Sequence, residues 1–229
     1  MTNRVHIQGL GAALAEFITH GSVRLLCVIL AGAFFVRFGL GAAEPWGRSD
    51  TLLLLGVMLY WPFQEWWMHR WLLHLRPFTV AGKRIEFDFA RLHRLHHEQP
   101  HAIDLAFLDL KTIVGSAALF TSVGWLLSGS FLGAASFMIG ATTSTMAYEW
   151  THFLTHTDYR PRSAYFRRVK NLHQWHHYKH EGYWYSFTLP WVDGWFGTGP
   201  HPREVQRSPF VKNLHGLAEA DLIEPRKGA

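Results

Sequence analysis

The sequence predicts an all-α membrane protein with four transmembrane helices arranged as two hairpins. Apolar residues make up 48% of the 229 residues and gather in four blocks, whereas charged residues make up only 17%. Soluble domains carry roughly 25% charged residues. The eleven Trp and seventeen Phe also favour a membrane protein. A chain of this length is expected to form one domain, covering residues 1–229.

The four apolar blocks are the expected spans. They cover residues 23–43, 51–68, 112–127 and 131–150. Each approaches the roughly 20 residues with which a helix crosses a bilayer, although the third block would also fit a buried helix of a soluble protein. The sequence AAEPWGRSD joins the first two blocks and SGS joins the last two. Each pair is therefore predicted to form a helical hairpin.

The distribution of basic residues predicts the orientation. The formal charge is +5, but the Lys and Arg residues are spread between apolar blocks, which favours an anionic lipid surface over nucleic acid as the partner. The two hairpin loops contain only Arg48, whereas segments 69–111 and 151–200 are rich in Arg and Lys. The positive-inside rule places these two segments on the cytoplasmic side. The N-terminus does not resemble a cleaved signal peptide, and the tail 201–229 is uninformative after Pro209.

Sixteen histidines are the unusual feature of the composition. The single cysteine, Cys27, excludes a disulfide framework and a cysteine-based zinc site. Ten of the histidines fall into four groups on the predicted cytoplasmic side, which is difficult to obtain by chance. These groups are His69 and His74; His93, His96 and His97; His152 and His156; and His173, His176 and His177.

The spacing within the groups predicts shared helix faces. Residues at i, i+3 and i+4 lie on one side of an α-helix, so each HxxHH triad should project together, as should His152 and His156. His69 and His74 are five residues apart and would diverge by roughly 140° on an ideal α-helix. Either they serve two different metal ions or the helix ends between them.

The number of imidazoles predicts two metal ions. Neutral imidazole suits Zn, Cu, Fe and Ni. Ten ligands are too many for one ion but fit two ions at about five ligands each, with positions open for O₂ or water. The alternative is that most of these histidines are ordinary structural or surface residues.

The motifs HRWLLH, HRLHH, HFLTH and HQWHH resemble the histidine boxes of the fatty acid hydroxylase/sterol desaturase superfamily of membrane di-iron enzymes. The phrase HQWHHYKHEGYWYSFTLPWVDGWFGT is similar to bacterial members. The resemblance covers roughly residues 50 to 200. It implies a four-helix membrane stalk with a cytosolic helical cap that carries the dimetal site, and all ten histidines as metal ligands.

The resemblance also implies the cofactors, partners and location. The cofactors would be two iron ions, for which zinc can substitute during purification, with O₂ as co-substrate. Electrons would come from a separate ferredoxin or cytochrome b5-type donor with its reductase. The protein would be a multi-pass protein of a bacterial inner membrane, with its active site on the cytoplasmic face.

The function that we expect is O₂-dependent hydroxylation of a C–H bond in a fatty acyl or related lipid. A lipid or sterol desaturase on the same scaffold is the alternative within enzymes. A non-enzymatic metal transporter or sensor is the alternative from another class, although transporters place ionisable ligands within their spans. A zinc protease is disfavoured because HExxH is absent.

Two carboxylates accompany the histidine groups. Glu65 and Glu149 are expected to accept a hydrogen bond from a ligating imidazole, the alternative being a solvated carboxylate. Asp104 and Asp158 are weaker candidates for the same role. Among the other histidines, His101 and His180 are each either an additional ligand or a group beside the site, and we expect neither to be a ligand. The remaining ones, His6, His20, His201 and His215, are expected at the surface.

Overall fold

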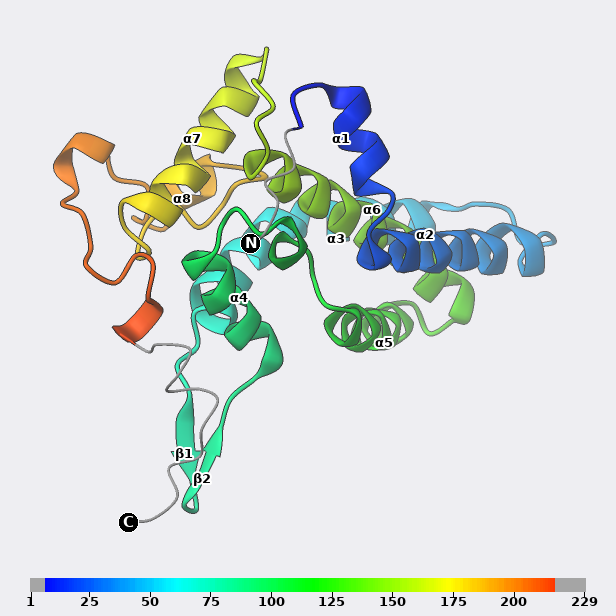
Figure 1. The fold of residues 1–229 in the computed structure, drawn as a ribbon. Coiled ribbons are helices and arrows are strands. Elements are labelled where there is room, and N and C mark those ends of the chain that lie inside the picture. Colours follow the sequence, from blue (N-terminus) through cyan, green and yellow to red (C-terminus); the bar gives the residue numbers. More distant parts are fainter. Residues whose placement is uncertain (1–6, 217–229) are drawn as a thin grey trace.

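The computed structural model describes residues 7–216 and is mostly helical (Figure 1). Its α-helices are α1 (Leu10–Phe17), α2 (Gly21–Phe34), α3 (Arg48–Trp67), α4 (Asp88–Glu98), α5 (Leu110–Ser128), α6 (Phe131–Thr155), α7 (Ala164–Tyr178) and α8 (Trp191–Trp195). π-Helices extend α2 and α3 as η1 (Phe35–Leu40) and η2 (Met68–Leu73). Short 3₁₀ turns are η3 (Ile103–Ala106), η4 (Pro202–Glu204) and η5 (Leu214–Gly216).

Helix α6 is the central element of the helical bundle. Helices α2, α3 and α5 all pack against it. Small residues on α6 permit this close packing, because a Cβ atom at Gly140 would lie only 2.6 Å from the carbonyl oxygen of Leu54 on α3. Close approach at small residues is how helices associate where no water drives them together.

The local sequence explains the hairpin between α5 and α6. The Asp109 side chain accepts a hydrogen bond from the Thr112 amide (3.0 Å) and begins α5. Gly129, with a φ of +68°, ends the helix in the left-handed conformation that glycine adopts readily. The Ser130 side chain then accepts a hydrogen bond from the Gly133 amide (3.0 Å) and begins α6. The chain therefore reverses over two residues.

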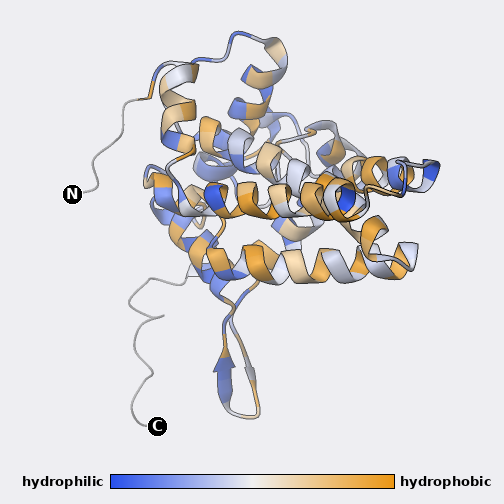
Figure 2. Cartoon of the chain, turned by 90° about the vertical axis from the view of Figure 1, so that its right-hand side faces the viewer, coloured by the Kyte–Doolittle hydropathy of each residue, from blue (hydrophilic) through white to orange (hydrophobic). Residues whose placement is uncertain are grey.

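Large apolar side chains are exposed on the outside of the bundle. Val28 of α2, Leu59 of α3 and Leu126 of α5 are 67%, 74% and 73% exposed. Figure 2 shows apolar residues along the long helices and hydrophilic residues mostly at the end from which the β-hairpin projects. Extensive exposed apolar surface is typical of a protein that meets lipid or another protein.

One helical segment within residues 7–216, Gly21–Leu40, is long and apolar enough to cross a membrane by itself. The other three predicted spans are helical and correspond to α3, α5 and α6. The predicted helical architecture is therefore present.

A buried ion pair joins η1, α3 and α6 at the end of the bundle far from the histidines. The Arg37 guanidinium donates two hydrogen bonds, of 2.9 and 2.8 Å, to the Asp50 carboxylate. Ser136 of α6 donates a third to the same carboxylate (2.6 Å). Arg37 is 2% exposed and also donates to the carbonyl oxygens of Glu44 and Pro45. The charge that interrupts the first apolar block is thus fully paired.

The prediction of an all-α protein is wrong in one detail. Strands β1 (Phe78–Val80) and β2 (Lys83–Ile85) form an antiparallel hairpin that projects from the body (Figure 1). Its turn contains Ala81 and Gly82, both with positive φ. The apolar blocks predict only helices. The two short strands do not bury one face, so their sequences lack the alternation of apolar and polar residues that would predict a strand.

Candidate metal centre

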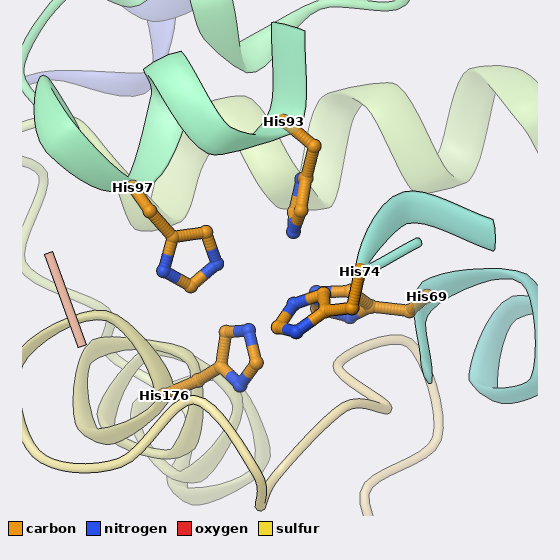
Figure 3. A group of neighbouring side chains, drawn as sticks. All are labelled: His69, His74, His93, His97 and His176. Carbon is orange, nitrogen blue, oxygen red and sulfur yellow. The ribbon is translucent and has the colours of Figure 1, made fainter. Parts of the chain in front are cut away.

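The ten histidines of the four motifs form two clusters at one end of the bundle. All of these side chains except His74 and His156 are buried. Within each cluster, one ring nitrogen from every histidine lies within 4.8 Å of the others. The first cluster contains His69, His74, His93, His97 and His176 (Figure 3), and the second contains His96, His152, His156, His173 and His177.

The two HxxHH triads divide their residues between the clusters. On α4, His93 and His97 enter the first cluster and His96 enters the second. Helix α7 does the reverse, because His173 and His177 enter the second cluster and His176 enters the first. Each triad shares one broad helix face, as predicted, but that face spans both clusters. The clusters are neighbours, with the rings of His97 and His177 centred 4.3 Å apart.

A π-helix explains how His69 and His74 reach the same cluster. Helix α3 continues into η2, in which hydrogen bonds run from residue i to i+5. The wider turn brings side chains five residues apart onto nearly the same face. The sequence left open whether these histidines serve two ions or the helix ends between them. The second alternative is confirmed, because η2 ends at Leu73, directly before His74, and the two rings lie 5.2 Å apart in one cluster.

The nitrogen positions in the second cluster fit a bound cation. Nε2 of His156 lies 2.8, 3.0 and 3.2 Å from Nε2 of His173, His96 and His152. A single imidazole nitrogen cannot form three hydrogen bonds with three like nitrogens. Two nitrogens bound to one ion at 2.0–2.1 Å and at a right angle would lie about 2.9 Å apart. The observed spacing therefore suits ligands around one metal ion.

The first cluster fits a cation for a complementary reason. Nε2 of all five histidines is buried and has no hydrogen-bond partner among residues 7–216. Figure 3 shows the five rings gathered around a common space. Buried polar atoms normally have a partner, so five unpartnered nitrogens that face one another indicate a missing ligand. An ion held by these nitrogens would provide it.

Burial keeps the imidazoles neutral, which is the form that binds a metal. The pKa of His69 is lowered to about 4, and the pKa values of His97 and His152 are lowered to about 3, in each case mainly by desolvation. A neutral imidazole has a lone pair on one nitrogen for the ion and a proton on the other. Protons therefore do not compete strongly with metal at neutral pH.

Backbone carbonyl groups orient several of the rings. The Nδ1–H groups of His69, His176 and His152 donate to the carbonyl oxygens of Tyr185, Tyr183 and Ala106, each over 2.7 Å. A proton on Nδ1 leaves Nε2 as the nitrogen that faces the cluster. No sequence motif could have identified these acceptors, because every residue has a carbonyl group and only the fold selects which one is near.

The structure gives Glu65 and Glu149 partners other than the expected imidazoles. Glu65 accepts hydrogen bonds from the amides of Phe187 (2.7 Å) and Thr188 (3.0 Å) and from the Thr188 hydroxyl group. Glu149 accepts from the Leu108 amide (3.2 Å). Both carboxylates therefore bind backbone amides of loop residues. They act instead on loops beside the clusters, since the Phe187 ring stacks on the His152 ring at 5.1 Å.

Asp193 of α8 is a buried carboxylate that our sequence reasoning did not identify as a site residue. It accepts hydrogen bonds from the Tyr185 amide (3.0 Å), the Ser186 amide (2.8 Å) and the Thr198 hydroxyl group (2.6 Å). Trp66 Nε1–H donates to the same hydroxyl oxygen (2.8 Å). Asp193 therefore fixes the backbone whose Tyr185 carbonyl orients His69. The VDGWFGT phrase that contains Asp193 and Thr198 was the available signal.

The remaining candidates lie outside both clusters. His101 is exposed beside Tyr178, and His180 accepts a hydrogen bond from the Gly182 amide. Asp104 and Asp158 are exposed. His201 is exposed as expected, and His6 lies outside the described residues. The expectation for His20 and His215 is wrong, because His20 stacks on Phe107 and His215 is half-buried against the backbone of His74.

An apolar cavity of about 280 Å³ reaches the first cluster. His69 and Glu65 line it at one end, and it extends between α3 and α5 past Ile113, Phe120 and Met138. Tyr60 and Leu119, which are exposed on the outside of the bundle, also line it. The cavity thus connects the histidines with the apolar outer surface of the helices.

The fold and the site together define a helical protein with paired five-histidine clusters of metal-binding geometry. Residues 54–198 match the model of the family described as fatty acid hydroxylase. This segment includes all ten clustered histidines and covers more than half of the chain. The chain belongs to the fatty acid hydroxylase family, in agreement with the resemblance of its histidine motifs.

Characterised relatives support the same family. The chain is 30% identical over 164 residues to the ceramide very long chain fatty acid hydroxylase scs7 of Schizosaccharomyces pombe, covering 68% of this chain and 44% of the relative. It is 26% identical over 162 residues to fatty acid 2-hydroxylase of Macaca fascicularis, covering 70% and 41%. The chain thus spans less than half the length of these relatives.

A solved structure shows the same fold. The structure described as full-length scs7p, in which only the hydroxylase domain is visible, aligns with a TM-score of 0.61. The alignment covers 88% of this chain and 70% of the other, at 19% sequence identity. The mostly helical architecture is therefore similar to that of the domain visible in this structure.

Proposed function

We propose that this protein is an O₂-dependent di-iron enzyme that hydroxylates a C–H bond of a fatty acyl or related lipid. The observation that carries the proposal is the apolar cavity that ends at His69 beside two clusters of five imidazoles. The cavity suits a hydrocarbon chain, and the clusters suit two metal ions. Membership of the fatty acid hydroxylase family and the names of the relatives support the same reaction.

The two clusters would each hold one iron ion through Nε2 atoms. When bound, the two iron ions supply the reduction of O₂ and the oxidising power to break a C–H bond. The imidazoles hold the ions, while the carbonyls of Tyr185, Tyr183 and Ala106 fix the ring orientations. Imidazole sites also bind Zn²⁺ well, so purified protein can contain zinc in place of iron.

The balance of the reaction requires an electron donor. One O₂, two electrons, two protons and the substrate R–H give R–OH and water. The substrate supplies the two electrons of its own C–H bond, and the other two must come from outside. We propose a separate ferredoxin or cytochrome b5-type protein with its reductase as the source.

The large apolar side chains exposed on the outside of the helical bundle support a membrane location. Helices α2, α3, α5 and α6 would cross the bilayer as two hairpins and form the stalk, with α4, α7 and α8 as the cytosolic cap. The basic segments 69–111 and 151–200 would then lie on the cytoplasmic side of the membrane. In a bacterium this membrane would be the inner membrane. A lipid chain would enter the cavity sideways between α3 and α5, near Tyr60 and Leu119.

The test is comparative lipid mass spectrometry on cells that express the intact protein or His96→Ala. His96 is buried in the second cluster, and its removal should abolish activity while leaving the helical stalk in place. A lipid that gains one oxygen atom only with the intact protein supports the proposal. His201→Ala, a change at an exposed histidine outside the clusters, is the matched control and should retain activity.

Other outcomes of this experiment would redirect the proposal. Loss of two hydrogen atoms from a lipid would indicate a desaturase on the same scaffold. An unchanged lipid profile with a competent reductase present, together with tight metal binding, would favour a non-enzymatic metal protein. An active His96→Ala variant would remove this residue from the site.

A further inference from the structure

The last described segment of the chain lies against the first cluster, although the family match ends at residue 198. We refer to residues 208–215 as the C-terminal strap. The Ser208 amide donates to the Lys179 carbonyl (2.8 Å), and its hydroxyl group donates to the Glu181 carboxylate (2.9 Å). Val211 and Leu214 are only 3% and 0% exposed. The strap is therefore packed into the body of the protein.

The strap contacts the ring of one first-cluster histidine. Nδ1–H of His97 donates to the carbonyl oxygen of Val211 (3.1 Å). His97 is fully buried, and its Nε2 has no other partner among the described residues. Because the proton resides on Nδ1, Nε2 presents its lone pair to the cluster. The Val211 carbonyl thus determines the direction of the His97 ring.

The strap also contacts the backbone of a second histidine of this cluster. The Arg76 side chain donates from Nε to Nδ1 of His215 (2.9 Å). Arginine can only donate, so the proton of His215 resides on Nε2, which donates to the carbonyl oxygen of His74 (2.8 Å). His74 directly follows η2, and the last carbonyls of a helix have no partner within it. His215 therefore fixes the chain from which the His74 ring projects.

We propose that the C-terminal strap is part of the metal centre and controls how firmly the first cluster retains its ion. The inference rests on the proposed function, since it requires that the clusters bind metal. Partners that orient a ligating histidine typically change metal affinity by about 10–100-fold. In the described part of the chain, no hydrogen bond from the strap reaches a histidine of the second cluster. The effect should therefore be confined to one of two ions.

The experiment measures metal release from the full-length protein loaded with Co²⁺, which reports its coordination through visible absorption. Release into a chelator is compared between wild type, His215→Ala and His215→Gln. His215→Ala should release one ion roughly tenfold faster and leave the release of the other unchanged. His215→Gln should restore slow release, because the amide can donate to the His74 carbonyl and accept from Arg76.

Further variants assign the ion and control for folding. His176→Ala removes a first-cluster ligand and should abolish the absorption of the ion that His215→Ala releases faster. His173→Ala removes a second-cluster ligand and should abolish the absorption of the other ion. His201→Ala controls for the loss of a histidine elsewhere and should release both ions at the wild-type rates. If His215→Ala does not fold, Arg76→Met tests the same contact from the exposed side.

Three outcomes would overturn the inference. Wild-type release rates for both ions in His215→Ala would show that the strap does not act on the metal. Equal acceleration of both ions, without rescue by glutamine, would indicate general loosening of the protein. A wild-type protein that binds no metal would overturn the proposed function itself, which is distinct from a failure confined to the strap variants.

Discussion

Asp193→Asn is the substitution that best tests how the protein orients His69. The Asp193 carboxylate is 1% exposed and accepts three hydrogen bonds, from the amides of Tyr185 and Ser186 and from the Thr198 hydroxyl group. Asparagine has one oxygen and one NH₂ group at the same positions. If its oxygen keeps the two bonds made by Oδ1, its NH₂ group faces the Ser186 amide, which is also a donor.

The size of the effect follows from these contacts. A hydrogen bond to a charged group contributes about 1.5–3 kcal/mol, and an unpaired buried donor costs about 1–3 kcal/mol. Together these give about 2.5–6 kcal/mol of unfolding free energy. For a chain of this size each kcal/mol lowers the melting temperature by about 2–4 °C, so a decrease of about 10 °C is expected. Metal affinity should also decrease, by about tenfold, because the Tyr185 carbonyl shifts away from His69.

The assay is thermal unfolding of the purified protein, with the metal content measured in parallel. Glu204→Gln is the matched control, since it removes the same charge from an exposed position on η4. Thr198→Val should produce part of the Asp193→Asn effect, because it removes one of the three donors. If Asp193→Asn melts within about 1 °C of wild type and retains its metal, Asp193 does not support the site as argued.

Two further predictions concern a buried charge and acid. Asp50→Asn leaves the Arg37 guanidinium buried without its anion, so it should cost about 3–5 kcal/mol of stability in thermal or denaturant unfolding. The double variant Arg37→Met/Asp50→Leu should recover most of that loss; if it is no more stable than Asp50→Asn, the charge is not the cause. In the metal-free protein the pKa of His69 is about 4, and those of His97 and His152 are about 3, each below the ordinary value near 6.5. As pH falls from 6.5 towards 4 the unfolded chain binds protons that the folded chain excludes, so stability should fall by about 1.4 kcal/mol per pH unit for each such histidine. A melting temperature that stays constant between pH 8 and pH 5 would contradict this reasoning.

The sequence predicted the helices and the clustered histidines well because both depend on local patterns. Apolar blocks of helical length gave α2, α3, α5 and α6 to within a few residues at most ends. Repeated histidines at i, i+3 and i+4 identified the side chains that converge. The division of each HxxHH triad between two clusters was not predictable, because it depends on how α4 and α7 cross other helices rather than on the spacing within them.

The contacts that surround the clusters could not be predicted for a different reason. Val211 and His215 lie in a tail without a motif, and their contacts with His97 and His74 join residues more than 100 positions apart. For Glu65 the one-turn spacing from His69 suggested an imidazole partner, but a buried carboxylate binds the nearest unpaired donors. Here those donors are the amides of Phe187 and Thr188 on a loop that only the complete fold brings near.

The π-helix η2 bears on how histidine spacings should be compared between sequences. A π-turn accommodates one extra residue in an otherwise α-helical segment. His152 on α6 and His156, directly after it, reach the second cluster with three intervening residues. His69 on η2 and His74, directly after it, reach the first with four. A one-residue insertion or deletion between two ligands is thus absorbed by a change of helix type. Alignments that treat HxxxH and HxxxxH as different sites would separate chains whose imidazoles occupy equivalent positions.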